Sequence, residues 1–220
     1  SYLITFVAGA VISVVYFAIY RLPFAMFLFG LNVLGLIYAM AANITTLYAA
    51  TQNPSQSLFD LGTGSNLAAA SLIYGFGLMA LGLWFDMKDP HRISRYSATG
   101  FWLHILAAPA LVNTGAMSLY NLGGTMGYLS TAALLIAVTL FALIIDRRSF
   151  LTASVFYFIA IISWAANETM GATTGTASVI FIIGAFFTAI GTWWIQIRSR
   201  IMQALPDFPG KDRLPPYHIN

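Results

Sequence analysis

Seven long apolar runs, separated by short polar segments, dominate this chain. A helix needs about 20 mostly apolar residues to cross a hydrocarbon core of about 30 Å. Only 8% of the residues are charged, against about 25% in a soluble domain. We therefore predict an all-α integral membrane protein: a bundle of about seven transmembrane helices over residues 1–197, followed by a short basic tail over residues 198–220. The predicted spans are residues 2–20, 24–50, 67–85, 98–117, 125–145, 150–166 and 174–197.

The basic residues follow every second run. The other connections carry only the acidic residues Asp60 and Glu168. Because basic loops resist translocation, this pattern predicts a cytoplasmic C-terminus and a first residue outside. The net charge of +3 is spread over helix ends rather than one continuous face, so we expect contacts with lipid headgroups and no nucleic-acid partner. The ten basic residues are Arg21, then Lys88, Arg92 and Arg95, then Arg147 and Arg148, then Arg198, Arg200, Lys211 and Arg213.

The connections and one proline predict local features. Residues 24–50 exceed the length that a span needs, so this helix should tilt or project outward. Residues 51–66 form the longest connection, rich in Gly, Ser, Asn and Pro, and long enough to fold over the outer end of the bundle. Pro109 lies inside the fourth span and should kink it, because proline denies the Ile105 carbonyl its usual donor.

Few polar side chains fall inside the predicted spans. His104 is the one ionisable residue there, and Asn32 and Asn113 are the amides nearest mid-membrane. We interpret these residues first as interhelical hydrogen-bond partners, worth about 0.6–2 kcal/mol each. The alternative is that they bind a ligand or cofactor, since polar groups inside a membrane often mark function. We predict no catalytic residue and no metal site.

The positions of the lysines and histidines limit the possible cofactors. A retinal protein needs a lysine inside its last helix, whereas Lys88 and Lys211 both lie outside the spans. A bis-histidine haem needs two facing histidines inside the bundle, whereas His91 and His218 lie in cytoplasmic segments. The absence of cysteine removes thiolate metal sites. We predict no cofactor; single axial ligation of a pigment or haem by His104 stays open.

Residues 86–95 form a short loop of mixed charge. It holds two carboxylates, Asp86 and Asp89, beside His91 and two arginines. Such a group could bind a metal or perform acid–base chemistry. We favour a turn cross-linked by salt bridges at the level of the lipid headgroups.

The stretch DMKDPHRISRYSATGFWLHILAAP, residues 86–109, carries a resemblance to a known family. It resembles uncharacterised bacterial multi-pass inner-membrane proteins, which have a D-x-x-D-P-x-R loop followed by a span that opens F-W-L-H-x-L-A-A-P. Weaker similarities are I-D-R-R at residues 145–148 and R-L-P-P at residues 213–216. Where a second histidine often follows in that family, this chain has Asn113. The resemblance implies a protein of the bacterial inner (cytoplasmic) membrane, and implies no activity.

Three functions fit these features. We favour a non-catalytic accessory or scaffold subunit of a larger membrane complex, with lipids and other membrane subunits as partners, because the sequence has no catalytic constellation. The alternative is a small-molecule permease or channel that works without a buried carboxylate. The third option is a lipid-active membrane enzyme that uses residues 86–95 at the cytoplasmic face. The sequence as a whole argues against an enzyme.

Overall fold

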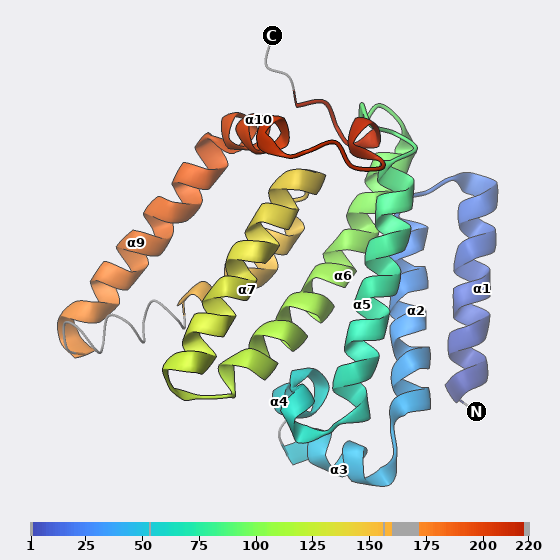
Figure 1. The fold of residues 1–220 in the computed structure, drawn as a ribbon. Helices are drawn as coiled ribbons and strands as arrows, with labels where there is room; N and C mark the ends of the chain where they lie inside the picture. The colour runs from blue at the N-terminus through green and yellow to red at the C-terminus, as the bar shows by residue number, and fades with distance from the viewer. Residues whose placement is uncertain (1, 53, 156, 160–171, 218–220) are drawn as a thin grey trace.

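The computed structural model describes residues 2–52, 54–155, 157–159 and 172–217. Within these ranges the chain is helical and contains no β-strand (Figure 1). Residues 149–155 and 157–159 are helical and form what we call the post-α7 segment. The other elements are α1 (Tyr2–Tyr20), α2 (Phe24–Ala41), α3 (Ile44–Gln52), α4 (Pro54–Phe59), the 3-10 turn η1 (Leu61–Thr63), α5 (Asn66–Asp86), α6 (Arg95–Tyr120), α7 (Gly124–Ile145), α9 (Ala172–Thr192), α10 (Trp194–Ala204) and the 3-10 turn η2 (Lys211–Arg213).

Five of these helices, α1, α2, α5, α6 and α7, are long and apolar enough to cross a membrane. The prediction of an all-α membrane protein is confirmed at this level. The predicted sixth span, residues 150–166, lies partly outside the described residues. Asn167 and Glu168 lie wholly outside them. Helix α6 continues through Pro109 and is 26 residues long.

Two of the predicted spans are divided in the structure. Residues 24–50 were expected to form one helix, but α2 ends at Ala41, and Ala42 is extended with ψ 136°. The polar side chains that follow favour local bonds over helix continuation; Thr45 Oγ1 donates to Asn43 Oδ1 at 2.6 Å. The span predicted over 174–197 ends with α9 at Thr192, and α10 then crosses the end of the bundle (Figure 1).

The connection at residues 51–66 has helical structure in its described part. It contains α4 and η1, which are hydrogen-bonded to the ends of the central helices. The Leu61 amide donates to Ser118 Oγ at 2.9 Å, and Asn121 Nδ2 donates to Asp60 Oδ2 at 2.7 Å. Ser71 Oγ donates to the Leu58 carbonyl at 2.8 Å. These bonds hold the connection against α5 and α6.

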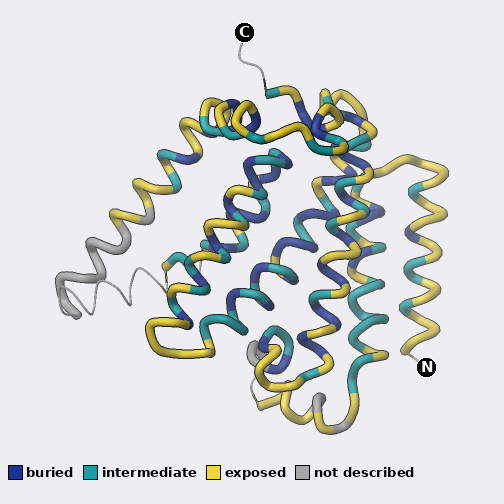
Figure 2. Tube along the Cα trace, viewed as in Figure 1, coloured by how far each residue is buried: buried dark blue, intermediate teal, exposed yellow. Residues whose placement is uncertain are grey.

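Burial is concentrated on α5 and α6, which run antiparallel in the middle of the bundle (Figure 2). Helix α1 packs on α2 at the edge, and Ser13 alone of its residues is buried. The rest of α1 carries exposed apolar side chains, including Ile4, Ile12 and Ile19. In a membrane this face meets lipid or another protein, since nothing in the described part of the chain covers it.

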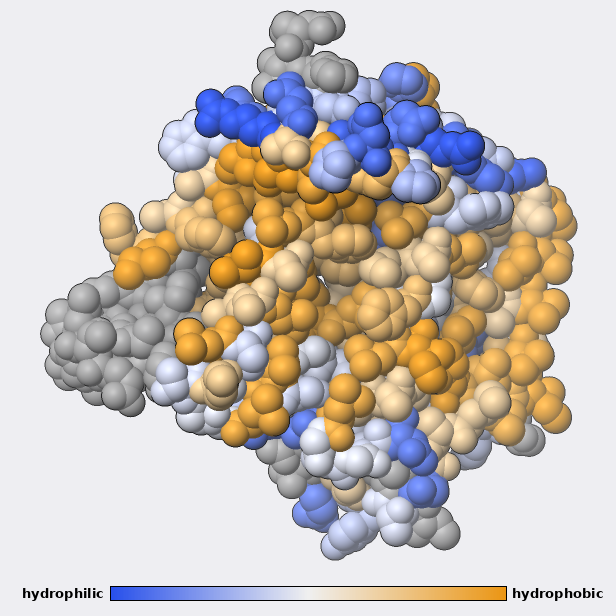
Figure 3. Space-filling view, viewed as in Figure 1, coloured by the Kyte–Doolittle hydropathy of each residue, from blue (hydrophilic) through white to orange (hydrophobic). Residues whose placement is uncertain are grey.

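The connections that carry the ten basic residues lie at one end of the bundle, which we call the basic end. These are the turn between α1 and α2, the loop between α5 and α6, the residues after α7, and the segment from α10 onward (Figure 1). Hydrophilic residues gather there in Figure 3, above a broad apolar belt. The sequence-based grouping of basic segments therefore corresponds to one end of the fold.

Candidate functional site

Asp86, the last residue of α5, lies at the centre of a buried charge cluster at the basic end. Its carboxylate is 4% exposed and accepts two hydrogen bonds from the guanidinium of Arg147. Arg147 Nε lies 3.0 Å from Asp86 Oδ2, and Arg147 Nη2 contacts Asp86 Oδ1. The same Nη2 donates to the Ser97 carbonyl at 2.9 Å. This bidentate pair joins α5, α6 and the residues after α7, whose side chains come from distant parts of the sequence.

His104 is the third member of the cluster and has no exposed surface. Its Nε2 lies 2.9 Å from Asp86 Oδ2. Because a carboxylate only accepts, Nε2 carries the hydrogen and donates it. Nδ1 has no hydrogen-bond partner among the described residues. The ring packs edge-on against Phe150 with centroids 5.8 Å apart.

Two glycines make room for these side chains. Gly82 lies one turn before Asp86 on α5, and Gly100 lies one turn before His104 on α6. A Cβ at Gly82 would lie 2.9 Å from the His104 ring. A Cβ at Gly100 would collide with the Asp86 carboxylate and lie 3.1 Å from the Gly82 carbonyl. Each helix therefore leaves a gap that the polar side chain of the other helix fills.

The turn after α7 directs Arg147 into the bundle. Asp146 ends α7 in the left-handed conformation, φ 57° and ψ 45°. The Arg147 amide then donates back to the Ala142 carbonyl at 2.9 Å, as in a helix C-cap. Left-handed backbone is unfavourable for a residue other than glycine, so contacts on Asp146 must compensate for it.

Those contacts come from Arg92 and Trp194. Arg92 Nη1 lies 3.1 Å from Asp146 Oδ2, and Arg92 Nη2 donates to the Asp146 carbonyl at 2.6 Å. The Trp194 indole N–H donates to Asp146 Oδ1 at 2.6 Å. Asp146 thus joins the α5–α6 loop to α10 directly above the buried cluster. Burial lowers the pKa of Arg92, as does the neighbouring charge of Arg147, but Arg92 remains a cation at neutral pH.

Asp89 shapes the start of α6. Its carboxylate accepts from the Ile93 amide at 3.1 Å, and from the Ser94 amide and hydroxyl at 2.8 Å each. Burial raises the pKa of Asp89, but the Ser94 and Ile93 donors outweigh it, and the pKa lies below its usual range. Ser94 in turn caps α6 by accepting from the Tyr96 amide at 3.2 Å.

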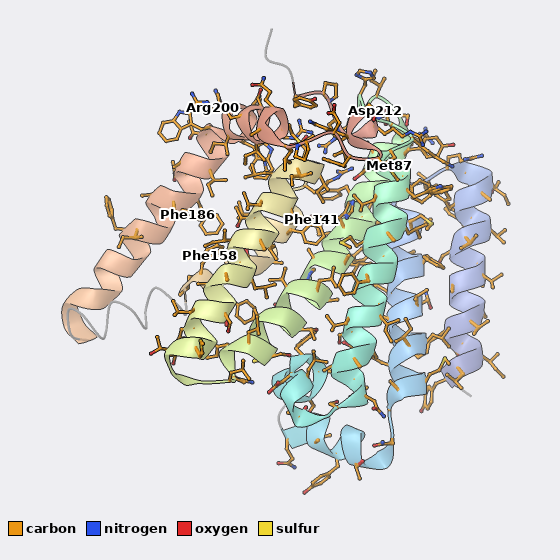
Figure 4. All side chains as sticks on the ribbon, in the orientation of Figure 1. Met87, Phe141, Phe158, Phe186, Arg200 and Asp212 are labelled. Carbon is orange, nitrogen blue, oxygen red and sulfur yellow. The ribbon has the colours of Figure 1, made fainter. Side chains whose placement is uncertain are left out.

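The residues that follow α10 cover this end of the fold. Arg198 donates to the carbonyls of Pro215 at 2.7 Å and Pro216 at 2.9 Å. Lys211 Nζ donates to the Leu205 carbonyl at 2.7 Å. Figure 4 shows Met87 and Asp212 both at this end, where the segment around η2 meets the α5–α6 loop. Residues 198–216 are thus bonded to one another across part of the basic end.

The three candidates from the sequence are not brought together. Asn32 lies between α2 and α1, where its amide would meet a Cβ at Gly9 and donates to the Leu28 carbonyl at 2.8 Å. Asn113 is half-buried on α6, nine residues beyond His104. Its backbone carbonyl accepts from the Tyr157 hydroxyl at 3.4 Å. Nine helical residues correspond to about 13 Å. Of the three, only His104 belongs to the charge cluster.

Two expectations about charge need correction. The turn at residues 86–95 was expected to be cross-linked within itself, but Asp86 and Arg92 pair with Arg147 and Asp146, beyond α7. Asp86 was expected in the loop, but it is the last residue of α5 and is buried. Sequence reasoning missed Arg147 because a residue 61 positions from its partner leaves no periodic signal. The glycines one turn before Asp86 and His104 were the available signal.

The cluster links α5, α6 and the residues after α7 through hydrogen bonds. Each polar atom of Asp86 and each charged group near it is engaged within the protein, and His104 Nε2 is occupied by Asp86. Within the described ranges no three His, Asp or Glu side chains gather into a metal site. The absence of a cofactor stays a prediction, and single axial ligation by His104 stays open.

Comparison with protein-family models, curated proteins and solved structures gives no match to this chain.

Proposed function

We propose that this protein is a non-catalytic accessory or scaffold subunit of a larger membrane complex. The observation that carries the proposal is the contrast between its interior and its surface. Asp86 and Asp146 at the basic end are paired with Arg147 and Arg92, whereas the outward faces of α1 and α7 carry exposed apolar side chains. A rigid bundle with apolar flanks is suited to packing against other membrane helices.

The interior does not favour a permease. A cleft of about 400 Å³ lies between α5, α6 and α7, and its lining is apolar, from Leu72 and Phe76 to Phe141 and Phe150. Asn32, His104 and Asn113 lie apart, so they do not line a common polar path. The buried carboxylate that ion coupling needs is present in Asp86, but Arg147 neutralises it.

The α5–α6 loop does not favour a lipid-active enzyme. Asp86 pairs with Arg147, Asp89 accepts from the Ser94 amide just before α6, and Arg92 pairs with Asp146. A general acid or base needs access to substrate, and Asp86 and Asp89 are 4% and 8% exposed.

The proposal includes a placement in the membrane. We place the basic end in the cytoplasm and residue 2 outside, following the distribution of Lys and Arg. We assign seven spans by adding residues 150–166 and α9 to the five candidate helices. The resemblance at residues 86–109 supports the bacterial inner membrane.

The first test is the native mass and composition of the protein after gentle detergent extraction from its source membrane. A discrete larger assembly of fixed composition is expected. Ile12→Trp on the exposed face of α1 should weaken that assembly, and Ile136→Trp on α7 tests the opposite flank; the two residues are 67% and 59% exposed. A lone, partner-free protein that transports a solute after reconstitution would overturn the proposal.

A further inference from the structure

A groove at the basic end lies apart from the charge cluster, between the end of α1 and the start of α6. It encloses about 190 Å³. Its lining comprises Phe17, Arg21, Ser94, Arg95, Tyr96 and Thr99. Two of these six residues are arginines from different parts of the chain, which the fold brings to one opening.

The two arginines have no acidic partner in the described part of the chain. Arg21 Nη1 donates to the Tyr96 hydroxyl at 3.3 Å, and Arg95 Nη1 donates to the Tyr20 carbonyl at 3.3 Å. Each guanidinium has five N–H donors, so most of them remain available. The nearby carboxylate of Asp89 is directed to the Ile93 and Ser94 amides. The groove therefore presents two positive charges that nothing within it neutralises.

The start of α6 adds to this positive potential. The helix is 26 residues long, begins at Arg95 and has no acidic residue in its first turn. A helix N-terminus carries a partial positive charge that anions stabilise and cations do not. An arginine in this position is unfavourable alone, and an anion bound beside it would offset both charges.

The backbone of Arg21 is consistent with a role for its side chain. Its φ of 53° lies in the left-handed region, which glycine or asparagine adopts at lower cost. The turn therefore keeps an arginine where the backbone alone would favour another residue.

The wall of the groove that faces the bundle is apolar and aromatic. Phe17 packs edge-on against Phe85 at 5.8 Å, and Phe85 stacks on Tyr96 at 5.9 Å. A small soluble anion needs only the arginines. A molecule with an anionic head and an apolar chain matches both the rim and the wall.

We propose that this groove binds the phosphate of an anionic phospholipid, with Arg21 and Arg95 as its ligands and the acyl chain along Phe17. The proposal does not depend on the accessory role. It differs from general attraction to an anionic surface, because it predicts that two particular arginines contribute more than others at the same end.

The test uses the full chain, purified in detergent and freed of lipid. Phosphatidylglycerol is titrated in while the thermal unfolding midpoint is followed, since a ligand of the folded state raises that midpoint. Phosphatidylcholine and inorganic phosphate are titrated in parallel. We expect phosphatidylglycerol alone to stabilise strongly. The apparent Kd should rise roughly tenfold for each arginine replaced, as expected for a charge-assisted hydrogen bond.

The variants are R21Q, R95Q and R21Q/R95Q, with R200Q as the matched control, an exposed arginine of α10 at the same end. R200Q should bind like the wild type. The single variants keep the test informative if the double variant fails to fold. An unchanged Kd in R21Q and R95Q, or an equal loss in R200Q, would overturn the site. Displacement of the lipid by millimolar inorganic phosphate would overturn its assignment to a lipid.

Discussion

The imidazole of His104 occupies the space where a side chain at Gly82 would lie, with ring atoms 2.9 Å from the position of such a Cβ. This contact brings α5 and α6 close enough for Asp86 to reach His104. The exchange is reciprocal, since Gly100 makes the matching gap for Asp86. The packing of the two central helices is thus adapted to their polar side chains.

Gly82→Ala should destabilise the protein. The added methyl group would press on a ring that has no exposed surface, and overpacking of this kind costs about 1–3 kcal/mol. We expect a lower thermal unfolding midpoint in detergent. Gly77→Ala on the same helix is the control, because a Cβ there meets nothing within 4 Å. If both substitutions have equal effects, the packing described here is wrong.

Replacing Asp86 by Asn, or Arg147 by Gln, should cost more. Each change leaves the other charge buried without its partner, at a cost of about 3–5 kcal/mol. The double variant D86N/R147Q should cost less than the sum of the two, and a double-mutant cycle measured by thermal unfolding would give the coupling. Arg148→Gln, at the adjacent exposed position, should be close to neutral. Simple additivity of D86N and R147Q would contradict the pairing.

Asp89 should make stability sensitive to acid. Its pKa in the folded protein lies below its usual range, so its stabilising effect is complete above the ordinary aspartate pKa of about 3.9. The effect is lost as pH falls through the lowered folded pKa. Asp89→Asn should therefore lower the unfolding midpoint at pH 7, by an amount that shrinks below pH 4. Asp212→Asn, an exposed aspartate at the same end, controls for the lost charge. If Asp89→Asn lowers the unfolding midpoint by the same amount at pH 7 and below pH 4, ionised Asp89 does not make stability sensitive to acid.

Trp194→Phe should loosen α10. The substitution removes the indole donor to Asp146 but keeps an aromatic ring, so the loss is about that of a hydrogen bond to a charged group, ~1.5–3 kcal/mol. Hydrogen exchange over residues 194–204 should accelerate. Trp193→Phe offers a control one residue away, at a side chain that is 56% exposed. Equal exchange rates in the two variants would show that the bond to Asp146 does not hold α10.

Orientation in the membrane can be tested by single cysteines, because the chain contains none. Ile93 in the α5–α6 loop is 87% exposed, and Leu122 between α6 and α7 is 69% exposed. In intact cells an impermeant maleimide should label Leu122→Cys and should label Ile93→Cys only after permeabilisation. The reverse pattern would invert the proposed topology, and equal labelling of both would contradict it.

The sequence predicted most of the helices because apolar length is a direct signal. The first span was predicted at Tyr2–Tyr20, which are the bounds of α1. The break after Ala41 was missed because it depends on a local hydrogen bond between Thr45 and Asn43, and hydropathy does not register such bonds. The turn at Trp193 was missed because tryptophan is common at membrane interfaces, so its presence there does not by itself indicate a turn.

The charge cluster was less predictable than the helices. His104 stood out as an ionisable residue within an apolar run, but its partners did not. Asp86 lies 18 residues from His104 and Arg147 lies 61 residues from Asp86. Such pairs depend on which helices are neighbours, and on a left-handed residue, Asp146, that turns the chain back. Neither is determined by composition or periodicity.

The separation between Asp86 and Arg147 also has a consequence for how the protein is made. After it completes α5 at Asp86, a ribosome reaches Arg147 only 61 residues later, when all of α6 and α7 have been made. Until then the carboxylate is more stable in water at the membrane surface than between helices. The central pair of helices can enter the bilayer early, but their close contact at the basic end must wait for the residues after α7. Assembly of this end therefore follows insertion, and a chain interrupted before Arg147 would leave the Asp86 carboxylate without the arginine that pairs with it.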